Sequence, residues 1–247
     1  MSSSLLPGKV SALQTSKSGL TYLLYLPPSF SPTSPSPNSA LLFLHGAGGV
    51  NDPSNVLGQS LLNILSTEST PTSLSALHSH VVVAPIAPSR GWQGHFPQVL
   101  DLLSDLRSDL NLQSKVHLAG QSMGGNGAWS LATERPDLVK SLTTVCGYVE
   151  GNRSGDTPLQ FPPSFSLSSL LPLPTWVFHG SDDTIVPVAA SDSIVTALKA
   201  AGSSVKYTRY APGLSPPCKT PSKDLAGHGS YELAFREEEW WKWLESV

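Results

Sequence analysis

The sequence predicts an α/β fold with a mostly parallel central sheet and helices on both faces. Seven short apolar runs have the length of β-strands, and from Leu41 onward they alternate with segments of helical periodicity. The central runs are apolar on both faces, which is typical of parallel strands covered on both sides. Strand and helix alternation resumes after every loop-like segment, so we expect a single domain over residues 1–247.

Individual elements follow from the same pattern. The clearest helix is Phe96–Leu110, where apolar residues recur at steps of three and four along one face. Further helices are expected at Leu57–Ser66, Met123–Thr133, Ala189–Ala201 and Tyr231–Leu244. The expected strands are Leu20–Leu26, Ala40–Leu44, Val81–Ala84, Val116–Ala119, Leu142–Cys146, Thr175–Phe178 and Val205–Tyr210.

Composition supports a folded chain despite an unusual bias. Ser, Pro and Gly make up roughly a third of the residues, a level that warns of disorder in an aperiodic sequence. Leu, Ile, Val and Phe still supply about a quarter, which is enough to bury a core. The Ser and Pro surplus gathers in three segments without helical periodicity, which we expect to be loops: residues 27–39, 158–174 and 211–222.

Charge and cysteine content exclude several kinds of partner and site. The net charge is -3 and no Lys/Arg cluster is present, so we expect no nucleic-acid or anionic-membrane partner. No apolar run is long enough for a membrane span or a signal peptide, which predicts a cytoplasmic protein.

Cys146 and Cys218 are too few for a disulfide framework or a zinc site, so two free thiols and no metal are expected. The oligomeric state stays open.

The strongest local signal is Gly120-Gln121-Ser122-Met123-Gly124, between an expected strand and an expected helix. This G-x-S-x-G pattern predicts a turn so tight that a Cβ at either glycine would collide with neighbouring backbone. The turn presents the Ser122 hydroxyl at the carboxyl edge of the sheet. It also begins a helix, whose N-terminal N–H groups favour negative charge. Ser122 is therefore the candidate nucleophile.

A serine nucleophile needs a base and an acid. When the serine lies on a strand-to-helix turn of this kind, called a nucleophile elbow, the acid precedes the histidine in the chain. His179 and His228 follow Ser122. His179 ends a strand and is expected to pack or stabilise a turn, whereas His228 lies in a glycine-flanked loop and is the expected base. Adjacent Asp182 and Asp183, on the loop after a strand, both remain candidates for the acid.

The glycine-rich stretch His45-Gly46-Ala47-Gly48-Gly49 follows a strand at the same edge. It completes neither G-x-x-x-x-G-K-[ST] nor G-x-G-x-x-G, so nucleotide binding is not expected. The N–H groups of Ala47 and Met123 are instead the expected oxyanion-hole donors. Candidate substrate contacts are Gly46, Gly48, Trp92 and Gln121, and Arg90, His95 and Phe96 are expected beside the cleft. For the aromatic pair Trp92 and Phe96, packing in the core is the alternative to substrate contact.

Taken together, these motifs resemble the α/β-hydrolase superfamily, and more narrowly its small carboxylesterase, feruloyl-esterase and polyhydroxybutyrate-depolymerase-like group. The resemblance implies an α/β-hydrolase fold and a Ser122/Asp183/His228 triad, and its H-G-x-x-D-x-x-V-P pattern favours Asp183 over Asp182. This sequence departs from the family's pattern before His228, because the segment between the last strand and the histidine is longer than is usual in the family. The matching stretches are residues 41–49, 120–129, 134–137, 178–188 and 227–235.

The resemblance implies a serine esterase that needs no cofactor and acts on a small-molecule ester through an acyl-enzyme. Residues 147–174, where such folds place a cap, show no helical stripe, so little or no helical cap is expected. A cleft bounded by loops should admit short-chain or bulky acyl and aryl esters. The alternatives are a lyase, acyltransferase or thioesterase with the same triad, or a binding module without turnover.

Overall fold

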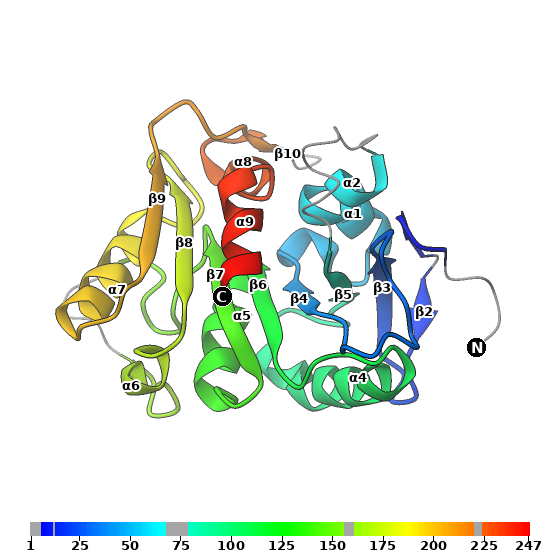
Figure 1. Cartoon of the computed structure of the whole chain (residues 1–247). Coiled ribbons are helices and arrows are strands. Elements are labelled where there is room, and N and C mark those ends of the chain that lie inside the picture. The colour runs from blue at the N-terminus through cyan, green and yellow to red at the C-terminus, as the bar shows by residue number, and fades with distance from the viewer. Residues whose placement is uncertain (1–5, 12, 68–78, 156–160, 220–223) are drawn as a thin grey trace.

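The structure is a computed structural model, and it describes residues 6–11, 13–67, 79–155, 161–219 and 224–247. In this part of the chain, most strands join one twisted sheet. Its order is β9-β8-β7-β6-β4-β5-β3 from left to right in Figure 1, and both β1 and β2 pair with β3. The strands are β1 Lys9–Val10, β2 Gln14–Thr15, β3 Thr21–Leu26, β4 Ala40–Leu44, β5 Val81–Pro85, β6 Val116–Gln121, β7 Val139–Val145, β8 Thr175–Gly180 and β9 Lys206–Tyr210.

From β4 to β9 every pairing in this sheet is parallel, while β3 runs antiparallel to β5 and carries the two-residue strands β1 and β2. The mostly parallel α/β sheet predicted from the sequence is thus confirmed. β10 Cys218–Lys219 falls within residues 211–222, which were predicted to be loop, and it pairs antiparallel with β11 Asp224–Leu225 in a separate two-stranded sheet.

Helices cover both faces of the sheet (Figure 1). Alternate residues of one strand point to opposite layers, so Leu42 and Leu44 join one apolar cluster while Leu41 and Phe43 join the other. The first layer contains α4 Phe96–Asp109, α5 Met123–Glu134, α6 Leu167–Leu170 and α7 Ala189–Ala200. The second contains α1 Pro53–Gly58, α2 Ser60–Thr67, α8 Tyr231–Ala234 and α9 Glu238–Ser246.

The predicted helix Leu57–Ser66 is wrong as a continuous element. α1 begins earlier, at Pro53, where the Asp52 carboxylate accepts the N–H of Asn55 at 3.0 Å. The chain then becomes extended at Gln59, and Ser60 has a φ of 59°. The Ser60 N–H donates to the Glu232 carboxylate at 2.8 Å, a tertiary contact that local periodicity cannot reveal.

The predicted helix Tyr231–Leu244 is likewise divided, because α8 ends at Ala234 and α9 starts at Glu238. Positions 235 and 240 would lie about 140° apart around an unbroken helix. The break instead allows Phe235 and Trp240 to pack together, with ring centroids 5.1 Å apart. The Trp241 indole N–H donates to the Phe235 carbonyl at 3.0 Å and satisfies the backbone there.

Little helical structure lies between β7 and β8. Within the described residues of this connection, 147–155 and 161–174, the one helix is the four-residue α6. Among all described residues, no helix combines the length and apolar character needed to cross a membrane. Three short 3-10 helices complete the secondary structure that bears on the site: η1 Ala47–Gly49, η2 Gln93–His95 and η3 His228–Ser230.

A buried histidine on β6 makes the stability of the fold sensitive to acid. His117 is buried, and its Nδ1 lies 2.7 Å from the Ser141 hydroxyl. Burial lowers the pKa of His117 to about 3, with smaller contributions from His80 and Lys140. In an unfolded chain a histidine binds its proton near pH 6.5, so between these two values the unfolded state holds more protons. The stability that depends on neutral His117 is complete above that range and is lost as the pH falls through it.

We predict that His117→Phe flattens the dependence of the free energy of unfolding on pH between about 6 and 4. The slope should fall by up to about 1.4 kcal/mol per pH unit, the value of one proton. Urea unfolding of both proteins across this range measures the slope independently of any packing difference. Equal slopes in the two proteins would show that His117 is not held neutral by the fold.

Candidate functional site

Ser122 stands at the turn between β6 and α5, in a backbone conformation that side-chain-bearing residues rarely adopt. Its φ is 53° and its ψ is -116°, and its N–H donates to the Val145 carbonyl of β7 at 2.9 Å. A Cβ on Gly120 would lie 2.1 Å from the Gly124 oxygen, and one on Gly124 would lie 1.8 Å from the Leu44 oxygen. The requirement for both glycines, predicted from the motif, is confirmed.

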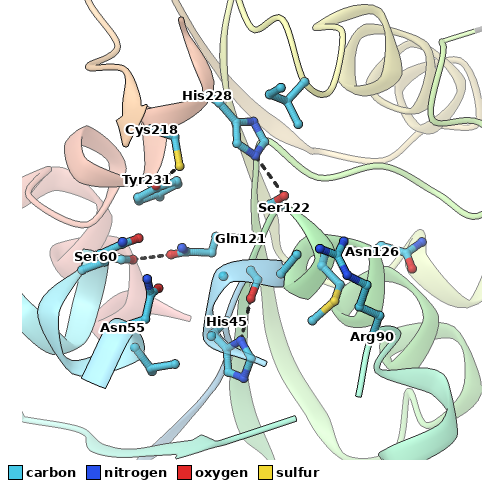
Figure 2. Close-up of a pocket in the computed structure, with 18 of the residues that line it drawn as sticks. His45, Asn55, Ser60, Arg90, Gln121, Ser122, Asn126, Cys218, His228 and Tyr231 are labelled. Carbon is cyan, nitrogen blue, oxygen red and sulfur yellow. Dashed lines mark hydrogen bonds between the residues drawn. The ribbon is translucent and has the colours of Figure 1, made fainter. Parts of the chain in front are cut away.

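His228 bridges Ser122 and Asp183. Its Nδ1 is 2.7 Å from Asp183 Oδ2, and its Nε2 is 3.0 Å from Ser122 Oγ (Figure 2). A carboxylate can only accept, so Nδ1 carries the proton and Nε2 is left to accept from the serine hydroxyl. The three side chains selected from the sequence therefore form one hydrogen-bonded chain, from a buried carboxylate to an available hydroxyl.

Both oxygens of Asp183 are occupied. Oδ1 accepts the N–H groups of Ile185 at 2.8 Å and Val186 at 2.9 Å, while Oδ2 faces His228 and lies 3.3 Å from His179 Nε2. Burial by itself would raise the pKa of Asp183, but the hydrogen bonds from His179, His228 and Val186 outweigh it and hold the pKa well below its usual range. Asp183 is therefore a fixed negative charge beneath His228.

The neighbouring candidates have other contacts. His179 is fully buried; its Nε2 donates to the Val186 carbonyl at 2.9 Å and its Nδ1 accepts from Ser191 Oγ at 2.7 Å. It stabilises the turn, as expected, and adds a donor close to Asp183. Asp182 points elsewhere, with Oδ2 accepting the N–H of Gly213 at 2.8 Å. Of the two adjacent carboxylates, only Asp183 contacts His228.

The loop carrying His228 is closely fitted to the Asp183 loop. Gly227 has a φ of 71°, and a Cβ there would lie 2.4 Å from the Asp182 carbonyl carbon. On the other side of the histidine, the Gly229 N–H donates to the Pro216 carbonyl at 3.0 Å. His228 itself is buried at the start of η3. The glycine on each side thus lets the imidazole approach the sheet edge.

Two backbone donors flank Ser122. Met123 is the first residue of α5 and Ala47 the first of η1, so neither N–H has an acceptor within its own helix. Both residues line the same cavity as Ser122. A Cβ on Gly46 would lie 3.5 Å from the Ser122 Cβ, which places the Ala47 loop directly against the serine. These donors can stabilise an anion beside Ser122 Oγ.

His45 holds that loop in place, a role that sequence reasoning missed. Its Nδ1 donates to the Gly46 carbonyl at 2.7 Å, and its Nε2 accepts the N–H of Ala87 at 3.0 Å. Burial lowers the pKa of His45 to about 4, so the neutral ring that these two hydrogen bonds require persists at neutral pH. The imidazole therefore ties the loop after β4 to the segment after β5.

Of the two alternatives for Trp92, substrate contact and core packing, the structure shows core packing, so the candidate substrate contact is wrong. Trp92 has no exposed surface; its indole N–H donates to the His45 carbonyl at 3.1 Å and its ring packs edge-on against the His45 ring. Phe96 is part of the core, and His95 Nε2 contacts Ser89 Oγ at 2.9 Å instead of facing the cavity. Of the four residues expected beside the cleft in this segment, only Arg90 lines it.

Ser122 and His228 lie at the wall of a cavity of about 620 Å³, a size suited to a small molecule. Gly46, Gly48 and Gln121, the other candidate substrate contacts, line it. In Figure 2, Asn55, Ser60 and Gln121 lie to one side of Ser122, with the Ser60 hydroxyl donating to Gln121 Oε1, and Arg90 and Asn126 lie to the other. Sequence reasoning missed several lining residues because no motif connects them: Asn55, Ser60, Asn126, Tyr148, Arg153 and Tyr231.

One group of potential metal ligands comes together in the described part of the chain, formed by Cys146, Asp183 and His228. The His228 and Asp183 atoms in this group already bond each other directly. Burial, followed by the charge of Asp183, raises the pKa of the Cys146 thiol well above its usual value, which disfavours the metal-binding thiolate. The arrangement is better suited to proton transfer than to metal binding. Cys146 and Cys218 are both free thiols, as expected.

The sequence matches no protein-family model and no curated protein. Solved structures are similar in fold. One is a thermostable esterase, with a TM-score of 0.74 and 23% identity over 98% of this chain and 64% of that one. Another is the fluorophosphonate-binding serine hydrolase FphF of Staphylococcus aureus, with a TM-score of 0.64 and 14% identity over 94% and 98% of the two chains.

A third is an S-formylglutathione hydrolase from Agrobacterium tumefaciens, with a TM-score of 0.60 and 15% identity over 95% of this chain and 98% of that one. Together with the sheet order and the Ser122 elbow, these similarities establish the α/β-hydrolase fold. The resemblance noted in the sequence is thus confirmed for the fold. The chain spans only 64% of the length of the thermostable esterase.

We predict that Gly124→Ala destabilises the protein by about 3 kcal/mol or more, or prevents folding, because its methyl group would overlap the Leu44 carbonyl. Gly58→Ala is the matched control, since Gly58 is helical and a Cβ there would have nothing within 4 Å. That variant should be neutral or more stable by up to about 1 kcal/mol. Urea unfolding compares the two, and equal stabilities would contradict the close approach of α5 to β4.

Proposed function

We propose that this protein is a serine hydrolase that cleaves carboxylic esters of small molecules through an acyl-enzyme intermediate. The observation that carries the proposal is the continuous hydrogen-bonded chain from Asp183 through His228 to Ser122 at the wall of a cavity. The esterases among the proteins of similar fold add support.

The geometry suits each step of acyl transfer. His228 Nε2 takes the proton of the Ser122 hydroxyl as Oγ attacks the ester carbonyl, and Asp183 stabilises the imidazolium that forms. The N–H groups of Ala47 and Met123 donate to the oxyanion of the tetrahedral intermediate. His228 then gives its proton to the departing alkoxide, which leaves as the alcohol. Water repeats the sequence on the acyl-enzyme, releasing the carboxylic acid and restoring Ser122.

The cavity also bears on the size of the substrate. In the described residues between β7 and β8, the single-turn α6 provides no helical lid over Ser122. Loops and the ends of strands form the walls, together with residues of α1, α2, α5 and α8. We therefore propose short-chain or bulky acyl and aryl esters as substrates, since a long lipid chain would lack an enclosing apolar surface.

We predict that Ser122→Ala lowers kcat/KM for p-nitrophenyl acetate by about ten-thousandfold or more, because the nucleophile is lost. A fluorophosphonate probe should add one covalent adduct to the wild-type protein, on the peptide containing Ser122, and none to the variant. Ser130→Ala, a serine further along the same helix, is the matched control and should be labelled normally. Labelling of Ser122→Ala, or a wild-type protein that neither reacts nor turns over, would overturn the proposed function.

We predict that Asp183→Asn lowers kcat by about a thousandfold or more, while Asp182→Asn changes it by less than about threefold. An amide at position 183 can donate to His228 Nδ1, which would leave the proton on Nε2 and prevent it from accepting the Ser122 proton. The two variants carry the same chemical change at adjacent positions. Steady-state kinetics on one ester compares them, and equal losses would remove Asp183 from the proposed mechanism.

A further inference from the structure

The cavity beside Ser122 is lined by two arginines that have no carboxylate partner in the described part of the chain. Arg153 donates to the Ile185 carbonyl at 3.4 Å and lies 5.5 Å from the centroid of the Tyr148 ring, while Arg90 is exposed. The chain has six arginines. Three are paired with acidic side chains, and Arg107 donates to two backbone carbonyls. The two that remain both line this cavity.

The segments that carry Arg90 and Arg153 both contact the first turns of α5. Arg90 precedes Gly91, whose N–H points to Met123 Sδ at 3.4 Å, at the start of α5. Tyr148, on which Arg153 packs, accepts the Asn126 side-chain amide through its carbonyl at 3.2 Å, one turn further along α5. Figure 2 shows Arg90 and Asn126 together on one side of Ser122.

The opposite side of the cavity is different in character. On that side the cavity is lined by neutral polar side chains, including Asn55, Ser60 and Gln121. Asp52 is the one carboxylate among the described lining residues, and it already caps α1 by accepting the Asn55 N–H at 3.0 Å. Among the described residues, therefore, no carboxylate that lines the cavity pairs with Arg90 or Arg153.

We infer that the preferred esters carry a carboxylate in addition to the ester group, and that Arg90 and Arg153 bind it. This inference rests on the proposed function. Guanidinium groups suit the role because they are planar, weakly hydrated and able to donate two parallel hydrogen bonds to one carboxylate. The N-terminal end of α5 adds a partial positive charge on the same side. A neutral ester of the same size makes neither interaction.

The test compares esters that differ only in a carboxylate and its uncharged primary amide. One pair places the difference on the acyl group, as mono-p-nitrophenyl adipate and its amide. The other places it on the alcohol, as the acetate esters of para-hydroxybenzoic acid and para-hydroxybenzamide. Each kcat/KM is divided by the spontaneous hydrolysis rate of the same ester, which removes the difference in intrinsic reactivity.

In at least one pair, wild-type protein at low salt should favour the carboxylate by about tenfold. The preference should shrink at about 1 M salt, where the Debye length is about 3 Å. The double variant Arg90→Gln/Arg153→Gln should bring the ratio to about one, and Arg153→Lys should keep part of the preference. Lys199→Gln, which removes one exposed positive charge from α7, is the matched control and should leave the ratio unchanged.

Two results would overturn the inference alone: a ratio of one or less in both pairs, or a preference that survives in the double variant. In either case, turnover of the amide members and probe labelling of Ser122 would leave the proposed function standing. If no ester is cleaved and Ser122 is not labelled, the proposed function fails and this inference fails with it.

Discussion

The close contact between the start of α5 and the end of β4 is the constraint on which the rest of the site depends. Gly124 has no side chain, so its backbone lies against the Leu44 carbonyl. That contact brings the loop after β4 beside Ser122, so that Ala47 and Met123 line the same cavity. A larger residue at position 124 would push α5, and Ser122 with it, away from this loop.

The fold and the three hydrogen-bonded side chains could be predicted because their signals are local or follow chain order. The strands of the parallel sheet are apolar on both faces, and the glycines around Ser122 are required by the turn itself. His228 and Asp183 were selected by their order along the chain and by resemblance, and the structure brings both to Ser122. Their catalytic roles and the single-domain organisation stay predictions.

The errors arose where tertiary contacts override local pattern. Ser60 interrupts a helical stretch because its N–H and hydroxyl bond Glu232 and Gln121, which are distant in the sequence. For Trp92 the sequence left substrate contact and core packing open, and its indole bonds the His45 carbonyl inside the core. The position of Arg153 could not be predicted either, since it lies on an aperiodic segment and contacts the carbonyl of Ile185, which is distant in the sequence.

The site thus divides into parts that differ in how freely they can change during evolution. Ser122, His45 and Asp183 are held by strand ends, close backbone contacts and buried hydrogen bonds, so most substitutions there would disturb the fold as well. Arg90 and Arg153 are exposed on connecting segments and hold no buried partner. Substitution, insertion or deletion in those segments would alter which molecules enter the cavity while the sheet stays intact. Among proteins descended from a common ancestor of this kind, sequence changes should therefore accumulate in the segments that carry Arg90 and Arg153 earlier than at Ser122.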